Sequence, residues 1–409
     1  MAHSATDTHI LFAARFSRMF AYGFLSVALA LYLAQIGLSE KKIGLLLTLT
    51  LLGDAVISLW ITTAADRIGR RRMLLLGAAL MVLAGVIFVV TKNFALLLVA
   101  AIVGVISPSG NEIGPFLSIE QAALSQLAPD ERRTKMFAWY NLVGSFATAL
   151  GALSGGGLMQ ILQNSGATAL DSYRAVLIGY AVLGVALVAL FTRLSAAIET
   201  GAAAEVALNS SMFGLHRSRG VVMKLSGLFA LDAFAGGFVV QSIMAYWFHV
   251  KFGVAPATLG SIFFGANILA GLSALLAARI AARIGLINTM VFTHIPSNIL
   301  LMLVPLMPSL PLAIAVLLIR FSISQMDVPT RQSYTMAVVS PDERSAASGV
   351  TSIARSVGAS LSPVLSGQLL AIPALLSMPF FFAGGLKIIY DLLLYRSFCI
   401  LKPPEEEHG

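Results

Sequence analysis

Long apolar segments separated by short polar turns run through the whole chain. A helix needs about 20 mostly apolar residues to cross a bilayer, and twelve segments reach that length. The chain is 58% hydrophobic and 11% charged, whereas soluble domains are roughly 45–50% apolar and about 25% charged. The pattern predicts an all-α integral membrane protein with twelve transmembrane helices. The predicted spans are 8–35, 43–65, 73–91, 94–126, 134–160, 172–194, 220–249, 257–282, 287–306, 309–337, 343–369 and 373–399.

Basic residues gather in alternate connections between these spans. The connection at 66–72 holds four arginines and one aspartate, and the other connections that follow even-numbered spans are also basic. Short cytoplasmic loops of membrane proteins carry an excess of Lys and Arg. Both termini are therefore expected on the cytoplasmic side of a multi-pass protein of the cell (inner or plasma) membrane. The Lys and Arg residues of the opposite connections are fewer: Lys41, Lys42, Lys92, Arg174 and Lys251.

Several classes of function are excluded by the remaining composition. Cytoplasmic loops account for the formal net charge of +8, so we expect no nucleic-acid partner. Cys399 is the single cysteine, which excludes internal disulfides and cysteine-rich metal sites. The P-loop pattern of a primary pump does not occur, and His249 and His294 are isolated in unrelated segments. We expect a monomer without enzyme activity, metal or cofactor.

The two halves of the chain repeat each other at an offset of about 211–216 residues. Because each half holds an even number of spans, the repeat predicts two parallel six-helix bundles related by an axis along the membrane normal. The predicted organisation is a first bundle at 1–194, a cytoplasmic linker at 195–219, a second bundle at 220–399 and a cytoplasmic tail at 400–409. The matching pairs are 18–24 with 232–238, 66–69 with 282–285, 129–132 with 341–344, and 151–156 with 362–367.

With this organisation the chain resembles the major facilitator superfamily over essentially its whole length. The connection between spans two and three is similar to the superfamily motif Gly-x-x-x-Asp-Arg-x-Gly-Arg-Arg, although Thr62 replaces the leading glycine. The glycine run on span five is similar to the drug-antiporter motif Gly-Pro-x-x-Gly-Gly, with Ala152 in place of proline, and span four lacks the arginine motif of proton-coupled drug antiporters. The resemblance implies a transporter of the drug/metabolite proton antiporter branch, whose first, fourth, seventh and tenth helices line a central cavity.

The same resemblance implies a conformational switch in the loop that carries Asp66, Arg67, Gly69 and Arg70. In the superfamily, contacts of this loop hold the two bundles together on the cytoplasmic side and release on switching. Asp66 is expected to approach the N-terminus of a neighbouring helix, where the helix dipole favours a carboxylate. A turn that only sets membrane orientation would explain the arginines and would leave Asp66 without a role.

Span four carries the first group of candidate substrate or coupling residues. Prolines and glycines at 108–115 predict a kinked or unwound helix, and Asn111 and Glu112 lie in that break. Glu120 and Gln121 follow two turns later, and eight residues at about 100° each put Glu112 and Glu120 on one face. The alternative is a packing kink with buried, hydrogen-bonded carboxyl groups.

Span ten carries the second group. Arg320, Ser324, Asp327 and Arg331 recur at helical spacing and form one polar stripe. Asp327 and Arg331 can pair, and Pro329 is expected to bend the helix between them. The alternative to a substrate or coupling role is an ion-pair network internal to the bundle.

Arg18 and Asp232 occupy equivalent positions of the repeat, on spans one and seven. Opposite charges at matched depth predict a contact that forms when the cytoplasmic side closes, and the alternative is a separate local partner for each. Lys387 and Asp391 are spaced as an i, i+4 pair on span twelve, for which we expect a structural role.

The predicted function is a secondary transporter that moves a small organic solute by alternating access, with protons as the coupling ion. A desolvated carboxyl group can take up a proton near neutral pH, and Glu112, Glu120 and Asp327 are the candidates. The motif resemblance favours proton-coupled efflux. The departures at Ala152 and in span four favour the alternative of a symporter or facilitator that imports a metabolite, and the arginines would suit an organic anion.

Overall fold

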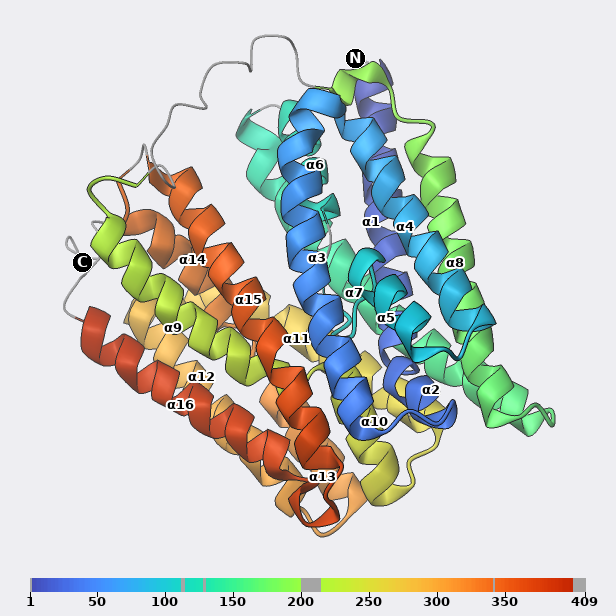
Figure 1. Cartoon of the computed structure of the whole chain (residues 1–409). Helices are drawn as coiled ribbons and strands as arrows, with labels where there is room; N and C mark the ends of the chain where they lie inside the picture. The colour runs from blue at the N-terminus through green and yellow to red at the C-terminus, as the bar shows by residue number, and fades with distance from the viewer. Residues whose placement is uncertain (1, 112–114, 128–129, 200–214, 341–342, 400–409) are drawn as a thin grey trace. The chain divides into compact units, whose positions relative to one another are not determined.

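The computed structural model describes residues 2–111, 115–127, 130–199, 215–340 and 343–399, and every regular element among them is a helix (Figure 1). The predicted all-α class is therefore confirmed. In this part of the chain, eight helices are long and apolar enough to cross a membrane, or nine when one bent pair is counted as a single span. Two shorter apolar helices add to them, Phe94–Val103 and Leu310–Phe321. This set is consistent with a twelve-helix fold.

The chain divides into two compact units, Met1–Leu208 with Gln241–Phe264 (unit 1) and Asn209–Val240 with Gly265–Gly409 (unit 2). The segment 241–264, which the sequence places in the second bundle, packs in unit 1. The predicted tail 400–409 lies outside the described residues. The helices of unit 1 are α1 (Ala2–Ser26), α2 (Leu29–Gln35), α3 (Glu40–Ile68), α4 (Arg70–Val90), α5 (Phe94–Val103), α6 (Phe116–Leu127), α7 (Asp130–Asn164), α8 (Ala169–Phe191) and α10 (Gln241–Phe252). Those of unit 2 are α9 (Arg219–Gly237), α12 (Leu286–Leu303), α13 (Leu310–Phe321), α14 (Asp327–Ala337), α15 (Arg344–Leu370) and α16 (Met378–Phe398), and α11 (Pro256–Ile284) continues from unit 1 into unit 2.

Predicted spans one, four, seven and ten each form two helices instead of one. The interruptions lie between α1 and α2, α5 and α6, α9 and α10, and α13 and α14, and α1 and α2 are bent by 42°. Irregular backbone at membrane depth is tolerated only where it is buried in protein or lines water. The break predicted in span four from its prolines and glycines is confirmed in the described residues that flank it.

The break in span ten lies elsewhere than predicted. The helix is interrupted between Phe321 and Asp327, and Pro329 lies inside the first turn of α14. The first amides of a helix have no partner within it, so a proline there removes no hydrogen bond. The prediction that Pro329 bends the helix is therefore wrong, and the break leaves Asp327 and Arg331 on one short helix.

Close helix packing organises each unit. In unit 1, α1 packs along α7 and α8, and a Cβ on Gly151 would overlap the backbone carbonyl of Phe20. In unit 2, α9 lies against α15 and α16 (Figure 1), and a Cβ on Gly358 would overlap the carbonyl of Ala230. Small residues at such crossings let helices approach each other closely in membranes.

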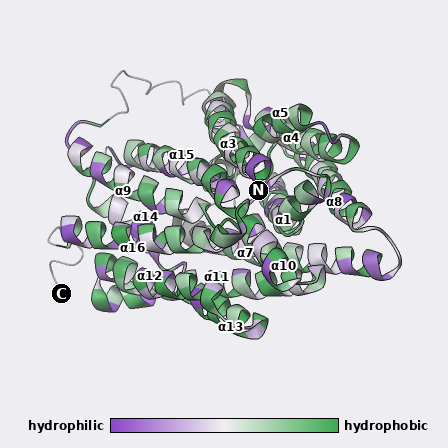
Figure 2. Ribbon diagram, turned by 60° about the horizontal axis from the view of Figure 1, so that its bottom comes forward, coloured by the Kyte–Doolittle hydropathy of each residue, from purple (hydrophilic) through white to green (hydrophobic). Residues whose placement is uncertain are grey.

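The helix surfaces match a hydrocarbon solvent. Hydrophobic residues follow most of the length of the helices, and hydrophilic residues gather at several helix ends (Figure 2). Large apolar side chains stay exposed in both units, among them Val90, Ile161 and Phe292. Lipid tails are as apolar as these side chains, so the exposure carries no cost in a bilayer.

Candidate functional site

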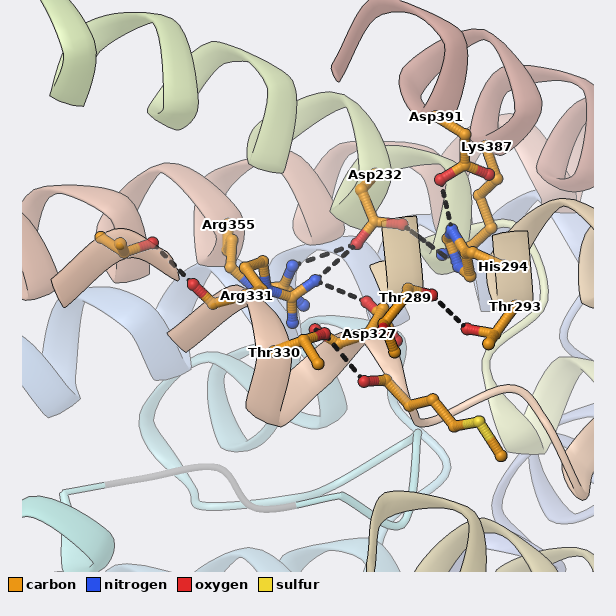
Figure 3. Close-up of polar contacts among 12 residues, drawn as sticks. Asp232, Thr289, Thr293, His294, Asp327, Thr330, Arg331, Arg355, Lys387 and Asp391 are labelled. Carbon is orange, nitrogen blue, oxygen red and sulfur yellow. Dashed lines mark hydrogen bonds and ion pairs between the residues drawn. The ribbon is translucent and has the colours of Figure 1, made fainter. Parts of the chain in front are cut away.

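Asp232 is buried at the centre of a charge cluster in unit 2, of which only Arg355 is partly exposed among the described side chains (Figure 3). Its Oδ1 accepts a hydrogen bond from Nζ of Lys387, and its Oδ2 lies 3.0 Å from a guanidinium nitrogen of Arg355 and 3.3 Å from one of Arg331. Arg331 also donates to Oδ2 of Asp327 at 2.9 Å. The Asp327–Arg331 pair expected from the sequence is therefore confirmed, and it is one part of a network that joins four helices.

A third carboxylate enters this network through a histidine. Nδ1 of His294 on α12 lies 2.8 Å from Oδ1 of Asp391 on α16, and Nδ2 of Asn298 donates to the other carboxylate oxygen at 3.2 Å. Nε2 of His294 lies 3.9 Å from Oδ1 of Asp232. Figure 3 shows Asp232 with the two arginines on one side and Lys387 and His294 on the other. The Asp232 cluster consists of Asp232, His294, Asp327, Arg331, Arg355, Lys387 and Asp391.

The charges of the Asp232 cluster balance. Three cations meet three carboxylates, so the sum is zero when His294 is neutral and +1 when it is protonated. Removing one partner of a buried ion pair costs about 3–5 kcal/mol, because the other charge stays buried without compensation. One proton more or less on this cluster therefore changes its internal balance strongly.

Unit 1 holds a smaller buried group around Arg18. The guanidinium of Arg18 on α1 donates to both oxygens of Glu120 on α6, at 2.6 and 3.0 Å. The hydroxyl of Tyr140 on α7 donates to the same carboxylate, and the ring of Phe116 lies under the guanidinium at 4.7 Å. The side chains of Arg18 and Glu120 are both fully buried. This bidentate ion pair, together with Tyr140, therefore holds α1, α6 and α7 together.

The interruption of span four lies beside this group. Asn111 is exposed there, and its backbone is fixed by the hydroxyl groups of Ser107 and Ser109. Gln121 is half-buried on α6. Glu112 lies outside the described residues, so its predicted place on one face with Glu120 stays a prediction. The freed carbonyl of Pro108 accepts hydrogen bonds from both the amide (3.0 Å) and the hydroxyl (2.8 Å) of Ser242 on α10.

The basic turn of the sequence ends at the N-terminus of α4. Gly69 has a φ of 113°, a left-handed conformation suited to glycine, and the side chains of Asp66 and Arg67 lie outside the described part. The carboxylate at this N-terminus belongs to Glu199, which accepts from the backbone amides of Arg70 (2.6 Å) and Arg71 (3.2 Å). The Arg70 guanidinium donates to Gln126 (2.8 Å) and to the carbonyl of Ile198 (3.2 Å). Arg70 thus has a structural contact within unit 1, and its role in orientation stays a prediction.

Several sequence-based predictions change at these sites. Arg18 and Asp232 each have partners within their own unit, which was the alternative to a contact between them, and that contact stays a prediction. Lys387 and Asp391 extend to Asp232 and His294, so their role goes beyond a local pair on one helix. His294, taken as isolated, contacts two acidic residues. The sequence did carry a signal for this cluster: several ionisable residues lie within apolar segments, and such residues in membrane spans pair with one another.

A membrane protein of long apolar helices, with interrupted spans and balanced charges buried inside its bundles, belongs to the class of solute transporters. Comparison with known proteins gives the family. The chain belongs to the Major Facilitator Superfamily, whose model matches residues 11–363. It is therefore a secondary transporter of a small solute and is not an enzyme.

The chain is similar to individual relatives in sequence and to a solved structure in fold. The chain is 33% identical over 420 residues to a protein of Saccharomyces cerevisiae described as "Uncharacterized membrane protein YJR124C", with 96% of this chain and 94% of that protein covered. It is 24% identical over 139 residues to the "Quinolone resistance protein NorA" of Staphylococcus aureus, which covers 34% of each chain. A crystal structure of a variant of the nucleoside transporter NupG superposes with a TM-score of 0.77 at 14% identity, over 96% of this chain and 99% of that one.

Proposed function

We propose that the chain couples the movement of a small organic solute to protons, with the Asp232 cluster as the coupling site. The observation that carries the proposal is the sharing of one buried carboxylate, Asp232, by cations from three other helices. Ionisable groups inside a membrane protein are kept in partnership and mark ion and substrate pathways. A change in the charge of Asp232 would therefore loosen α9 from α14, α15 and α16 together.

The coupling step follows from the geometry around Arg331. This guanidinium bridges Asp232 and Asp327, at 3.3 and 2.9 Å. A proton on either carboxylate leaves Arg331 to the other one, and the cluster gains one positive charge. This extra positive charge disappears when the proton is released or when a charged group of the solute binds. Proton release and solute binding are therefore coupled. Glu120 pairs with Arg18 and Tyr140, whereas Asp232 and Asp327 share one cation, Arg331. For this reason we assign coupling to Asp232 and Asp327.

We further propose efflux as the direction of transport. The loop at 66–71, the glycine run of span five and the partial likeness to the quinolone resistance protein support this direction. The proposal includes cytoplasmic termini, a monomer, and a switching role for Asp66 and for a transient contact between Arg18 and Asp232. The alternative is a proton symporter or facilitator that imports a metabolite, which Ala152 in place of the motif proline favours.

Transport by purified protein in liposomes tests the proposal. A panel of dyes, nucleosides, sugars and organic acids is assayed with and without a pH gradient, in both gradient directions, and the wild-type protein is expected to accumulate at least one class against its gradient. Asp232→Asn should abolish gradient-driven accumulation and retain solute exchange without a gradient, because coupling needs the ionisable group and translocation does not.

The matched control is Asp171→Asn, an exposed aspartate whose ion pair with Arg174 spans 3.6 Å. It should behave as the wild type, because surface pairs contribute little. Gradient-driven accumulation by Asp232→Asn at the wild-type level would refute the coupling proposal. Accumulation of the solute only on the side toward which protons flow would favour the symporter.

A further inference from the structure

The predicted cavity helices carry four arginines: Arg15, Arg18, Arg320 and Arg331. Arg15 lies over the ring of Tyr140 at 4.7 Å, and of the other three, two are already neutralised. Arg18 is bound by Glu120 at 2.6 Å, and Arg331 by Asp327 at 2.9 Å. Arg320 on α13 is the third. It has no ion pair and no hydrogen bond from its Nε in the part of the chain that the structure describes, although it is only 9% exposed.

No ion pair compensates the charge of Arg320 among the described residues. The ring of the next residue, Phe321, lies 4.7 Å from the guanidinium carbon. Asp327 acts on this charge electrostatically, but its carboxylate forms its ion pair with Arg331, at 2.9 Å. A buried charge without a partner is strongly unfavourable, so its retention calls for a function.

The backbone beside Arg320 is also irregular. Arg320 lies in the last turn of α13, directly before the interruption that ends at Asp327. The C-terminal end of a helix dipole favours a cation. The carbonyls of Leu318 and Ile319, however, are taken by the amide of Ser322 at 3.1 and 3.2 Å. The dipole therefore explains why a cation is tolerated, and it leaves the Nε donor of the guanidinium without an acceptor.

We propose that Arg320 binds an anionic group of the transported solute, a carboxylate or a phosphate. This inference rests on the proposed transport function and names the class of its substrate, a small organic anion. A guanidinium matches the two oxygens of either group with two parallel hydrogen bonds. Binding would neutralise the buried charge of Arg320, which is an excess positive charge beside the balanced Asp232 cluster in the empty transporter.

The first test needs no knowledge of the solute. An arginine that waits for a ligand destabilises the empty protein, so Arg320→Met in the purified full-length protein should leave the melting temperature unchanged or raise it. Arg331→Met is the matched control, and it should lower the melting temperature, because it leaves Asp232 and Asp327 with one cation fewer. A fall for Arg320→Met as large as that for Arg331→Met would show a structural partner and overturn the proposal.

The second test compares anions with neutral molecules of the same shape. The melting temperature is measured with benzoate against benzamide, succinate against succinamide, and phenyl phosphate against phenol. At least one anion should protect the wild-type protein more than its neutral match does, and the successful pair separates carboxylate from phosphate. Arg320→Gln should weaken that protection by about tenfold or more in concentration, since hydrogen bonds to charged groups contribute about that factor, and Arg320→Lys should restore part of it.

Two outcomes separate this inference from the proposed function. Protection by no anion, or equal protection of Arg320→Gln, overturns the anion proposal and leaves proton-coupled transport of a neutral or cationic solute intact. Anion protection that depends on Arg320, without any transport driven by a pH gradient, supports the anion site and refutes proton coupling.

Discussion

The carboxylate of Glu199 lies at the first turn of α4, where it accepts a hydrogen bond of 2.6 Å from the backbone amide of Arg70. Glu199 comes from the segment that follows α8, and this segment is also tied to α1 through Ser195, whose amide donates to Asp7 at 3.0 Å. A carboxylate at a helix N-terminus satisfies free amides and interacts favourably with the helix dipole. We expected Asp66 to approach the N-terminus of a neighbouring helix. At the N-terminus of α4, Glu199 supplies the carboxylate from another part of unit 1.

Glu199→Gln should lower the stability of the purified protein by about 1 kcal/mol, because it removes the charge that caps α4. The melting temperature measures the effect. Arg193→Gln is the control, since Arg193 is an exposed charge of the same segment, and it should leave the melting temperature unchanged. Equal melting temperatures for wild type and Glu199→Gln would contradict the capping role.

His294→Gln should reduce gradient-driven transport and leave solute exchange without a gradient intact. His294 joins Asp391 to Asp232, whereas glutamine keeps polar atoms near both acids and cannot take up a proton. His249→Gln is the control, because His249 bonds to a backbone carbonyl, that of Val254 at 3.0 Å. Unchanged gradient-driven transport in His294→Gln would exclude His294 from the coupling path.

Glu343 should make a pH-dependent contribution to stability. Burial opposes its ionisation, but hydrogen bonds from the backbone amides of His216, Ser218 and Arg217 outweigh this effect and lower its pKa to about 2. A carboxylate with a lowered pKa stabilises the fold fully above its ordinary value of 4.5 and loses this contribution as the pH falls toward 2. Glu343→Gln should therefore melt below the wild type at pH 7, and the difference should shrink between pH 4.5 and pH 3. An equal difference in melting temperature between Glu343→Gln and the wild type at pH 4.5 and at pH 3 would show that ionisation of Glu343 plays no part.

Gly358→Ala should disrupt the contact between α15 and α9. The added Cβ would overlap backbone atoms of Ala230, which have no means of moving aside, and overpacking costs about 1–3 kcal/mol. Gly349→Ala on the same helix meets nothing within 4 Å, so it should be neutral or should stabilise the protein by up to about 1 kcal/mol. Size-exclusion profiles and melting temperatures of the two variants measure the contrast. Equal behaviour would show that the helices do not depend on this close approach.

Sequence alone predicted what depends on local pattern. Segment length and the Pro/Gly cluster gave the helices and the break near Asn111, and i, i+4 spacing gave the pair of Asp327 and Arg331. Contacts between side chains of different helices depend on how the helices are rotated about their axes. The residue periodicity within one helix does not determine this rotation. Lys387 and Asp391 share a face of α16, yet each finds its acid or base on another helix. Glu199 was missed for a similar reason, because a chain turn carries it back to α4.

Helix α10 has a consequence for how the protein could be assembled from pieces. Gln241 donates to Ser26 at 2.7 Å, and Tyr246 to Glu40 at 2.8 Å, so the second half of span seven bonds to helices encoded before the linker. Two polypeptides separated at that linker, made together in one cell, would each lack a part that the other supplies. They should therefore recognise each other and copurify, and the two repeats are interlocked parts that neither chain completes alone.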